Sequence, residues 1–188
     1  MQQTQLFVEE RAMDVPGLHY MPDYIIPEEE LALLRHIDAS PWLTSLKRRV
    51  QHYGYRYDYK SRTVDPSLYL GPLPDWIQKL ALRLEQEHII KIPDQVIINE
   101  YLPGQGIAPH TDCIPCFGPV ICSLSLGSAC IMELKHEQKT EILLEPRSLL
   151  ILSGDARYRW QHGIPGRKYD HGVARGRRVS LTFRNVLR

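Results

Sequence analysis

The chain has no long apolar run, no internal repeat and no low-complexity segment. Its first residues, MQQTQLFVEERAMDVPG, include acidic side chains and no uninterrupted apolar stretch, so we expect neither a secretory signal nor a membrane span. A cytoplasmic protein is the expectation. The absence of repeats favours one compact unit, a monomer with a short loose N-terminus over residues 1–17.

An excess of charge of one sign is also absent. The sequence has 23 Lys and Arg against 22 Asp and Glu, so a polyanion would have to be bound by local basic patches. Four cysteines in 188 residues indicate reduced thiols rather than a disulfide framework. With 43% hydrophobic residues, this length suits one domain, residues 1–188, with a substantial core.

The periodicity predicts helices first and strands later. PEEELALLRHIDA (27–39) and PDWIQKLALRLEQEH (74–88) each combine an early proline with apolar residues spaced along one helix face. After Pro93 the chain changes to short β-branched runs separated by turn residues, which predict a sandwich or barrel over 95–188. The expected strands are QVIINEYL, PVICSLSLGS, ACIMEL, TEILLEP, SLLILSG, RYRWQHGI and RRVSLTFRNV.

The last expected strand alternates between a polar and an apolar face. The polar face carries Arg178, Ser180, Thr182 and Arg184, and the apolar face carries Val179, Leu181 and Phe183. Two arginines alone are more often surface residues than site residues. Asn99 and Tyr101 share a face in the same way, however, and so do His110 and Asp112. If these strands line one barrel, its cavity collects hydrogen-bonding groups, metal ligands and arginines.

Residues 104–117, GQGIAPHTDCIPCF, hold two possible metal signatures: H-x-D at His110 and Asp112, and C-x-x-C at Cys113 and Cys116. H-x-D supplies two ligands of a 2-His-1-carboxylate iron site, whose third ligand should be a histidine far downstream. His162 fits, at 52 residues (162 minus 110) after His110 and after the strand-like RYRW. C-x-x-C has no second pair, so a four-ligand zinc site is disfavoured and both cysteines are expected to be small loop residues.

The motifs NEYLPGQGIAPHTD, LSLGS, QHGIP and RRVSLTFR together resemble the AlkB family of Fe(II)- and 2-oxoglutarate-dependent dioxygenases. The resemblance implies an α+β, mainly β fold: a double-stranded β-helix, or jelly roll, with the N-terminal helices packed on it. It implies Fe(II) as the metal and 2-oxoglutarate and O2 as co-substrates. The implied iron ligands are His110, Asp112 and His162.

The same resemblance implies a binding site for 2-oxoglutarate. Arg178 would pair with the distal carboxylate, since a guanidinium can donate two charge-assisted hydrogen bonds. Asn99, Tyr101 and Arg184 would complete the pocket. Ser180 stands where the founding bacterial member has an asparagine. Three protein ligands leave three positions on an octahedral iron, two for the 2-oxo acid and one for oxygen.

Residues 46–62, LKRRVQHYGYRYDYKSR, interleave six cationic residues with four alternating tyrosines, which we expect to share one strand face. Cations for phosphates and aromatic platforms for bases are typical of nucleic-acid binding, although a tyrosine ladder packed on the core is the structural alternative. In the AlkB family this segment resembles a lid over a flipped nucleotide. The expected phosphate contacts are Arg48 and Arg49, and the expected base contacts are Tyr55, Tyr57 and Ile114.

A second basic cluster, GRKYDHGVARGRR (166–178), would extend the nucleic-acid surface. The favoured partner is single-stranded DNA or RNA, or a base flipped from a duplex. The favoured reaction is oxidative dealkylation of N-alkylated bases, as in alkylation repair. Hydroxylation of a wobble uridine in tRNA is an alternative, since LSLGSACIMEL and ARYRWQHGIPGRKYD resemble tRNA-modifying members. A protein or small-molecule hydroxylase, and a binding module on an inactive barrel, are further alternatives.

Overall fold

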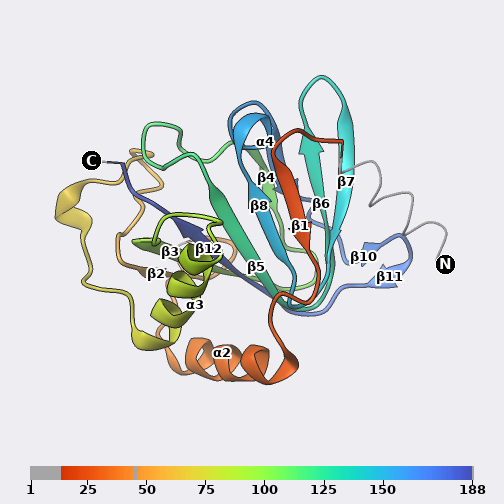
Figure 1. The fold of residues 1–188 in the computed structure, drawn as a ribbon. Coiled ribbons are helices and arrows are strands. Elements are labelled where there is room, and N and C mark those ends of the chain that lie inside the picture. Colours follow the sequence, from red (N-terminus) through yellow and green to blue (C-terminus); the bar gives the residue numbers. More distant parts are fainter. Residues whose placement is uncertain (1–13, 45, 188) are drawn as a thin grey trace.

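Two helices and two antiparallel sheets account for most of the computed structural model, which describes residues 14–44 and 46–187 (Figure 1). Helix α2 spans Pro27–Ala39 and begins with Pro27 and three glutamates, whose charge suits the positive helix N-terminus. The Glu29 side chain accepts a hydrogen bond from the Ile26 amide at 3.0 Å. Helix α3 spans Asp75–Gln86, and a short 3-10 turn covers Pro66–Leu68.

The major sheet has six strands in the order β1-β8-β5-β12-β3-β2. Their bounds are β1 Leu18–Met21, β8 Leu149–Leu152, β5 Ile121–Gly127, β12 Arg178–Arg184, β3 Gln95–Tyr101 and β2 Val50–Tyr53. Strand β12 pairs along its whole length with β3 and along most of it with β5, so its side-chain alternation is fixed on both sides.

The minor sheet has four strands in the order β4-β9-β6-β7. Their bounds are β4 Ile107–His110, β9 Gln161–Ile164, β6 Cys130–Lys135 and β7 Lys139–Leu144. A small hairpin, β10 (Tyr169–Asp170) with β11 (Val173–Ala174), follows β9. This arrangement brings β4 and β9, which are far apart in sequence, into direct antiparallel pairing.

Two apolar cores hold these layers together. The first lies between the two helices and the outer face of the major sheet, where Ile37 and Ile77 pack with Ile98, Leu181 and Phe183. The second lies between the two sheets and includes residues of both, such as Leu150 and Leu134. The polar face of β12 therefore points away from the helices and into the space between the sheets.

Two expectations about local structure need correction. The predicted strand RYRWQHGI is wrong in its first half: Gly154–Tyr158 form the short helix α4, while QHGI forms β9, so His162 lies within a strand rather than after one. Strand β1 follows directly on the segment expected to be loose, and it pairs with β8. Residues 1–13 of that segment lie outside the described residues, while Val15 is buried. None of the described helices combines the length and apolar character that crossing a membrane requires.

Candidate active site

His110, Asp112 and His162 converge between the two sheets. His110 ends β4 and pairs directly with His162 of β9, and the two rings are 4.6 Å apart between centroids. One potential ligand atom from each of the three residues lies within 4.8 Å of the others. Two imidazoles and one carboxylate at this spacing suit a 2-His-1-carboxylate iron site with positions left for other ligands. The triad predicted from the sequence is thus brought together.

The charge states of the triad also suit a metal. Burial would raise the pKa of Asp112, but the nearby Arg184 cation, with smaller contributions from the two histidines, holds it well below the usual value. Burial lowers the pKa of His162 to about 4, so its imidazole is neutral at physiological pH. Metal ligands must be deprotonated, and both residues therefore meet that requirement.

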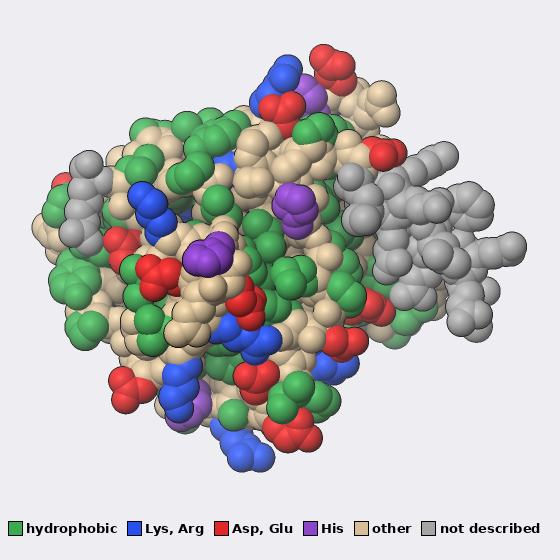
Figure 2. Space-filling model, viewed as in Figure 1, with side chains coloured by type: hydrophobic (Ala, Val, Ile, Leu, Met, Phe, Trp, Pro, Cys, Tyr) green, Lys and Arg blue, Asp and Glu red, His purple; other side chains and the backbone are tan. Residues whose placement is uncertain are grey.

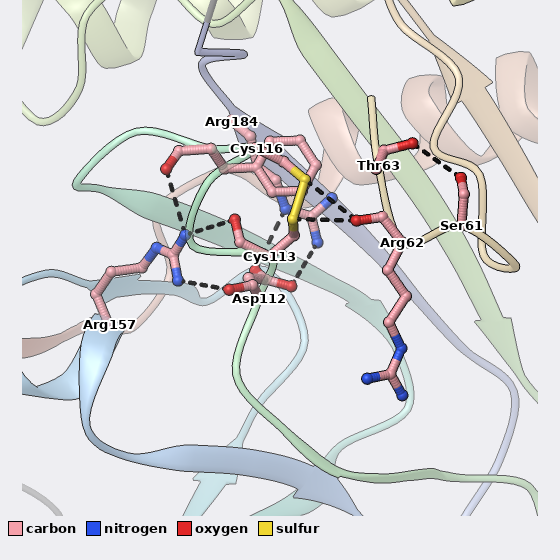
Figure 3. The surroundings of a disulfide bond; sticks show 9 residues. Ser61, Arg62, Thr63, Asp112, Cys113, Cys116, Arg157 and Arg184 are labelled. Carbon is pink, nitrogen blue, oxygen red and sulfur yellow. Dashed lines mark hydrogen bonds and ion pairs between the residues drawn. A yellow bond between two sulfur atoms is a disulfide. The ribbon is translucent and has the colours of Figure 1, made fainter. Parts of the chain in front are cut away.

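The loop that carries Asp112 is held by a buried arginine from α4 (Figure 3). The Arg157 guanidinium donates hydrogen bonds to the backbone carbonyls of Asp112 at 2.9 Å, Cys113 at 3.3 Å, Gly118 at 3.3 Å and Phe117 at 3.4 Å. Arg157 is only 2% exposed. One side chain thus fixes the backbone on both sides of the C-x-x-C segment. Sequence analysis missed this role, because RYRW had been assigned to a strand.

Cys113 and Cys116 form a disulfide, so the expectation of reduced thiols is wrong for this pair. The two residues fall in one tight turn, in which the amide of Cys116 bonds to the carbonyl of Cys113. Both sulfur atoms lie near the carbonyl oxygen of Arg62, at 3.3 and 3.5 Å. The pair therefore lies between the metal-ligand loop and the segment 46–62. Cys122 and Cys130 are free and buried, in agreement with the expectation of reduced thiols.

A cavity of about 900 Å³ opens beside the triad. The inner face of the major sheet lines it with Asn99, Tyr101, Arg178, Ser180, Thr182 and Arg184. This is the polar face predicted from the alternation of β12 and β3, and that part of the prediction is confirmed.

Arg178 is the buried cation of this cavity that best suits an anionic ligand. It is 3% exposed and lies 5.5 Å from the centre of the Tyr101 ring. Its Nη2 donates to Ser125 at 2.9 Å, while its buried Nε has no hydrogen-bond partner among the described residues. A buried, unpaired guanidinium N–H is costly, and a carboxylate is its natural partner. The observed donor set therefore fits 2-oxoglutarate, with its distal carboxylate on Arg178.

The tyrosines of residues 46–62 do not share one face. Strand β2 ends at Tyr53, which packs on Trp76, and Tyr55 is buried against Tyr69. Beyond them, Tyr57 and Tyr59 turn into the cavity and contact each other edge to face. Tyr57 lines the cavity, so its contact with a base stays a prediction, whereas Tyr55 is buried and does not line the cavity. The expected alternation fails because the chain leaves the sheet after Tyr53.

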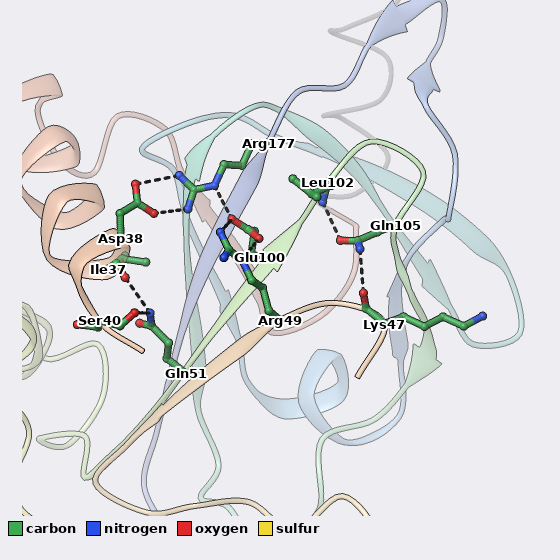
Figure 4. A network of polar contacts seen from close by, with 10 residues as sticks. All are labelled: Ile37, Asp38, Ser40, Lys47, Arg49, Gln51, Glu100, Leu102, Gln105 and Arg177. Carbon is green, nitrogen blue, oxygen red and sulfur yellow. Dashed lines mark hydrogen bonds and ion pairs between the residues drawn. The ribbon is translucent and has the colours of Figure 1, made fainter. Parts of the chain in front are cut away.

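The cations of the same segment also separate into two groups. Arg48 and Arg62 line the cavity together with Ile114. Arg49 lies outside it, where it binds Glu100 (Figure 4) and covers the Trp42 ring at 4.7 Å. Arg49 therefore links this segment to β3 through an ion pair. Sequence analysis did not single out Tyr59 and Arg62 within the lid, although both belong to its interleaved motif.

The second basic cluster is largely neutralised within the fold. Arg167 and Arg175 both bind Asp170, and Arg177 bridges Asp38 and Glu100 (Figure 4). Lys, Arg, Asp and Glu side chains are interspersed on the face seen in Figure 2. The expected continuous basic surface over 166–178 is therefore not what these side chains form.

Comparisons with known proteins identify a family and several relatives of this chain. Residues 41–184 match the family model of the 2OG-Fe(II) oxygenase superfamily. The uncharacterised protein L905 of Acanthamoeba polyphaga mimivirus is 41% identical over 198 residues, which cover 98% of this chain and 92% of the relative. An Arabidopsis thaliana protein named alkylated DNA repair protein ALKBH8 homolog is 38% identical, over 93% of this chain and 59% of its own length.

A Xenopus tropicalis protein named tRNA (carboxymethyluridine(34)-5-O)-methyltransferase alkbh8 is 43% identical over 82% of this chain. The chain spans only 26% of that relative. Among solved structures, OsALKBH1 superposes with a TM-score of 0.71 at 18% identity, over 90% of this chain and 97% of the other. That likeness shows the fold alone, and it confirms the predicted mainly β jelly roll.

Proposed function

Because the chain belongs to the AlkB family within the 2OG-Fe(II) oxygenase superfamily, and is accordingly an Fe(II)- and 2-oxoglutarate-dependent dioxygenase, we propose that it oxidises an alkyl group on a base of DNA or RNA. His110, Asp112 and His162 would hold the iron, and Arg178 the distal carboxylate of the co-substrate. When bound, iron and 2-oxoglutarate supply the oxidation of a C–H bond by O2, with succinate and carbon dioxide as by-products.

The observation that carries this proposal is the pair of aromatic rings that residues 46–62 place in the cavity beside the triad. Tyr57 and Tyr59 present aromatic rings to the cavity, and Arg62, which also lines it, is exposed. An enzyme that acts on a base must take it out of the stack and hold it between flat or apolar side chains. The lid supplies such side chains on the substrate side, while Asn99 and Arg178 bind the co-substrate on the sheet side.

We take an N-alkyl group as the first candidate target. Hydroxylation of an N-methyl carbon gives a hemiaminal, which loses formaldehyde and restores the base. The name of the Arabidopsis relative, which refers to alkylated DNA repair, supports this interpretation. The name of the Xenopus relative refers to a tRNA uridine and supports hydroxylation of a wobble-uridine side chain as the second candidate.

Nucleoside mass spectrometry tests the proposal. Iron-loaded enzyme is incubated with 2-oxoglutarate and either alkylated DNA or total tRNA, and the digested nucleosides are compared with those of a His162→Ala control. Loss of a methylated nucleoside together with formaldehyde release supports dealkylation. A hydroxylated uridine in tRNA supports the second candidate. Unchanged nucleosides in both pools, alongside continued succinate formation, would point to a protein or small-molecule substrate.

A further inference from the structure

The charges that line the cavity are strongly unbalanced. Among the described lining residues, four are arginines and one is a carboxylate. The arginines are Arg48, Arg62, Arg178 and Arg184, and the carboxylate is Asp112. Two lining histidines, His110 and His162, belong to the triad and add no negative charge. A ligand in this cavity therefore meets an excess of positive charge.

Two of the arginines have assigned partners. Arg184 binds both carboxylate oxygens of Asp112, at 3.1 and 3.3 Å, so these two charges cancel. Arg178 is the proposed partner of the co-substrate. Fe(II) and the dianion of 2-oxoglutarate carry equal and opposite charges, so binding both leaves the excess unchanged.

Arg48 and Arg62 have no carboxylate partner among the described side chains. Arg48 is half-buried, donates to the neutral amide oxygen of Asn99 at 2.9 Å and lies 6.0 Å from the centre of the Tyr101 ring. Arg62 is exposed, and its guanidinium points away from the disulfide (Figure 3). The lid carboxylate of Asp58 accepts a hydrogen bond from the Lys60 amide at 2.8 Å and does not line the cavity.

Resting on the proposed function, we infer that the target base is uncharged, and that this cavity discriminates against bases made cationic by alkylation. Methylation at N3 of cytosine or N1 of adenine places a positive charge on the ring, whereas methylation at N3 of uracil or thymine does not. A like charge near uncompensated arginines is disfavoured. Ile114, 47% exposed at the cavity, offers no negative charge to offset it. A substrate phosphate that paired with Arg62 alone would leave Arg48 uncompensated.

Two matched oligonucleotides test this inference. One carries 3-methylcytosine and the other 3-methyluracil at the same position, so the bases have nearly the same shape and differ in charge. Dissociation constants are measured without oxygen, and kcat/KM is measured from the demethylated product. We expect the 3-methyluracil strand to be favoured roughly tenfold or more in both affinity and kcat/KM. Equal values, or a preference for 3-methylcytosine, would overturn the inference.

Four variants separate charge from shape. Ile114→Glu adds a carboxylate to the cavity and should shift the ratio of the two substrates toward 3-methylcytosine by roughly tenfold, whereas the matched Ile114→Gln should not. Arg62→Gln should shift the ratio in the same direction as Ile114→Glu. Lys60→Gln, which removes an exposed lid cation that does not line the cavity, should keep the parent ratio.

A result that contradicts the proposed function can be distinguished from a result that contradicts this inference alone. If neither strand binds nor stimulates succinate formation, N-dealkylation fails as the proposed reaction and the inference falls with it, while the tRNA candidate is decided by the nucleoside analysis of total tRNA. If both strands are used but Ile114→Glu and Ile114→Gln behave alike, nucleobase oxidation stands and the charge argument is wrong.

Discussion

Arg184 and Asp112 form a buried ion pair with two contacts, 3.1 Å from Nη2 to Oδ1 and 3.3 Å from Nε to Oδ2. Their side chains are 9% and 7% exposed. The pair joins the end of β12 to the loop after β4 and so connects the two sheets at the proposed iron site. It also holds the carboxylate ionised, since the adjacent cation lowers the pKa of Asp112 despite its burial.

Replacing Arg184 with Met should destabilise the metal-free protein strongly, because a buried carboxylate loses its partner. The expected loss in the free energy of unfolding is about 3–5 kcal/mol. Added Mn(II) should recover part of it, since a bound cation also compensates Asp112. Arg159→Met is the control, because Arg159 pairs with Asp155 at the surface, where such pairs contribute about 0–1 kcal/mol. Equal losses in the two variants would contradict the central role of the buried pair.

Arg157→Lys should weaken metal binding without removing a ligand. A lysine keeps the charge but cannot span four carbonyls, so the loop that carries Asp112 loses its support. We expect Mn(II) affinity, measured by calorimetry, to fall about 10- to 100-fold. Arg159→Met, on the exposed side of the same segment, should bind Mn(II) like the parent.

The cysteine pair provides the second comparison for this loop. The double variant Cys113→Ser, Cys116→Ser should lose at most about 2 kcal/mol of stability, because its disulfide closes a very short loop. It should also keep most of its Mn(II) affinity, since Arg157 still holds the loop. If this double variant lost metal and Arg157→Lys did not, the disulfide rather than the arginine would position Asp112.

The sequence was sufficient to predict the polar inner face of the cavity. Strand β12 is paired on both sides, so its period of two is strict, and Arg178 and Arg184 share a face as expected. The histidines of the triad were found because H-x-D and a distant histidine are a known ligand pattern. Helix α2 was predicted within its observed bounds, since its proline and glutamates mark the N-terminus.

Other features depend on partners that are distant in sequence. Arg49 and Arg177 looked like free cations, yet both bind Glu100, a single buried carboxylate on β3. The tyrosine alternation assumed a strand that in fact ends at Tyr53. The short helix α4 carries Arg157, which bonds to backbone carbonyls of residues 112–118, and these distant contacts leave no mark on the local pattern of RYRW. None of these partners can be identified from the spacing of residues within one segment.

Tyr57→Ala and Tyr59→Ala should weaken oligonucleotide use, because both rings line the cavity. Stacking of a base on an aromatic ring contributes roughly 1–3 kcal/mol, which corresponds to about a 5- to 150-fold loss. Tyr55→Ala should instead lower the melting temperature and leave oligonucleotide affinity of the folded protein unchanged, since Tyr55 is a buried packing residue. A Tyr55 variant with parent stability and lost affinity would reverse these assignments.

His52 should make stability depend on pH in acid. Burial, with smaller contributions from Arg56 and Arg184, lowers its pKa from 6.5 to about 4, and its neutral Nδ1 accepts a hydrogen bond from the Tyr57 amide at 3.3 Å. Because the folded-state pKa is depressed, the stability that depends on neutral His52 is complete above pH 6.5. It is lost as pH falls toward 4.

The comparison with His52→Asn isolates this effect, since His162 also has a lowered pKa and contributes in the same window. Between pH 6.5 and 4, the slope of unfolding free energy against pH should be smaller in the variant by up to about 1.4 kcal/mol per pH unit. Denaturant titrations of the metal-free proteins measure it. Parallel curves for parent and variant would show that His52 does not titrate as described.

The central claim is that a nucleobase is oxidised over His110, Asp112 and His162 at the expense of 2-oxoglutarate. The most direct measurement is the ratio of succinate formed to nucleoside oxidised in one reaction, with a methylated oligonucleotide as the added substrate. The account predicts one succinate for each oxidised nucleoside, and no oxidised nucleoside with His162→Ala. Succinate formed at the same rate with and without oligonucleotide, while every nucleoside stays unchanged, would contradict it.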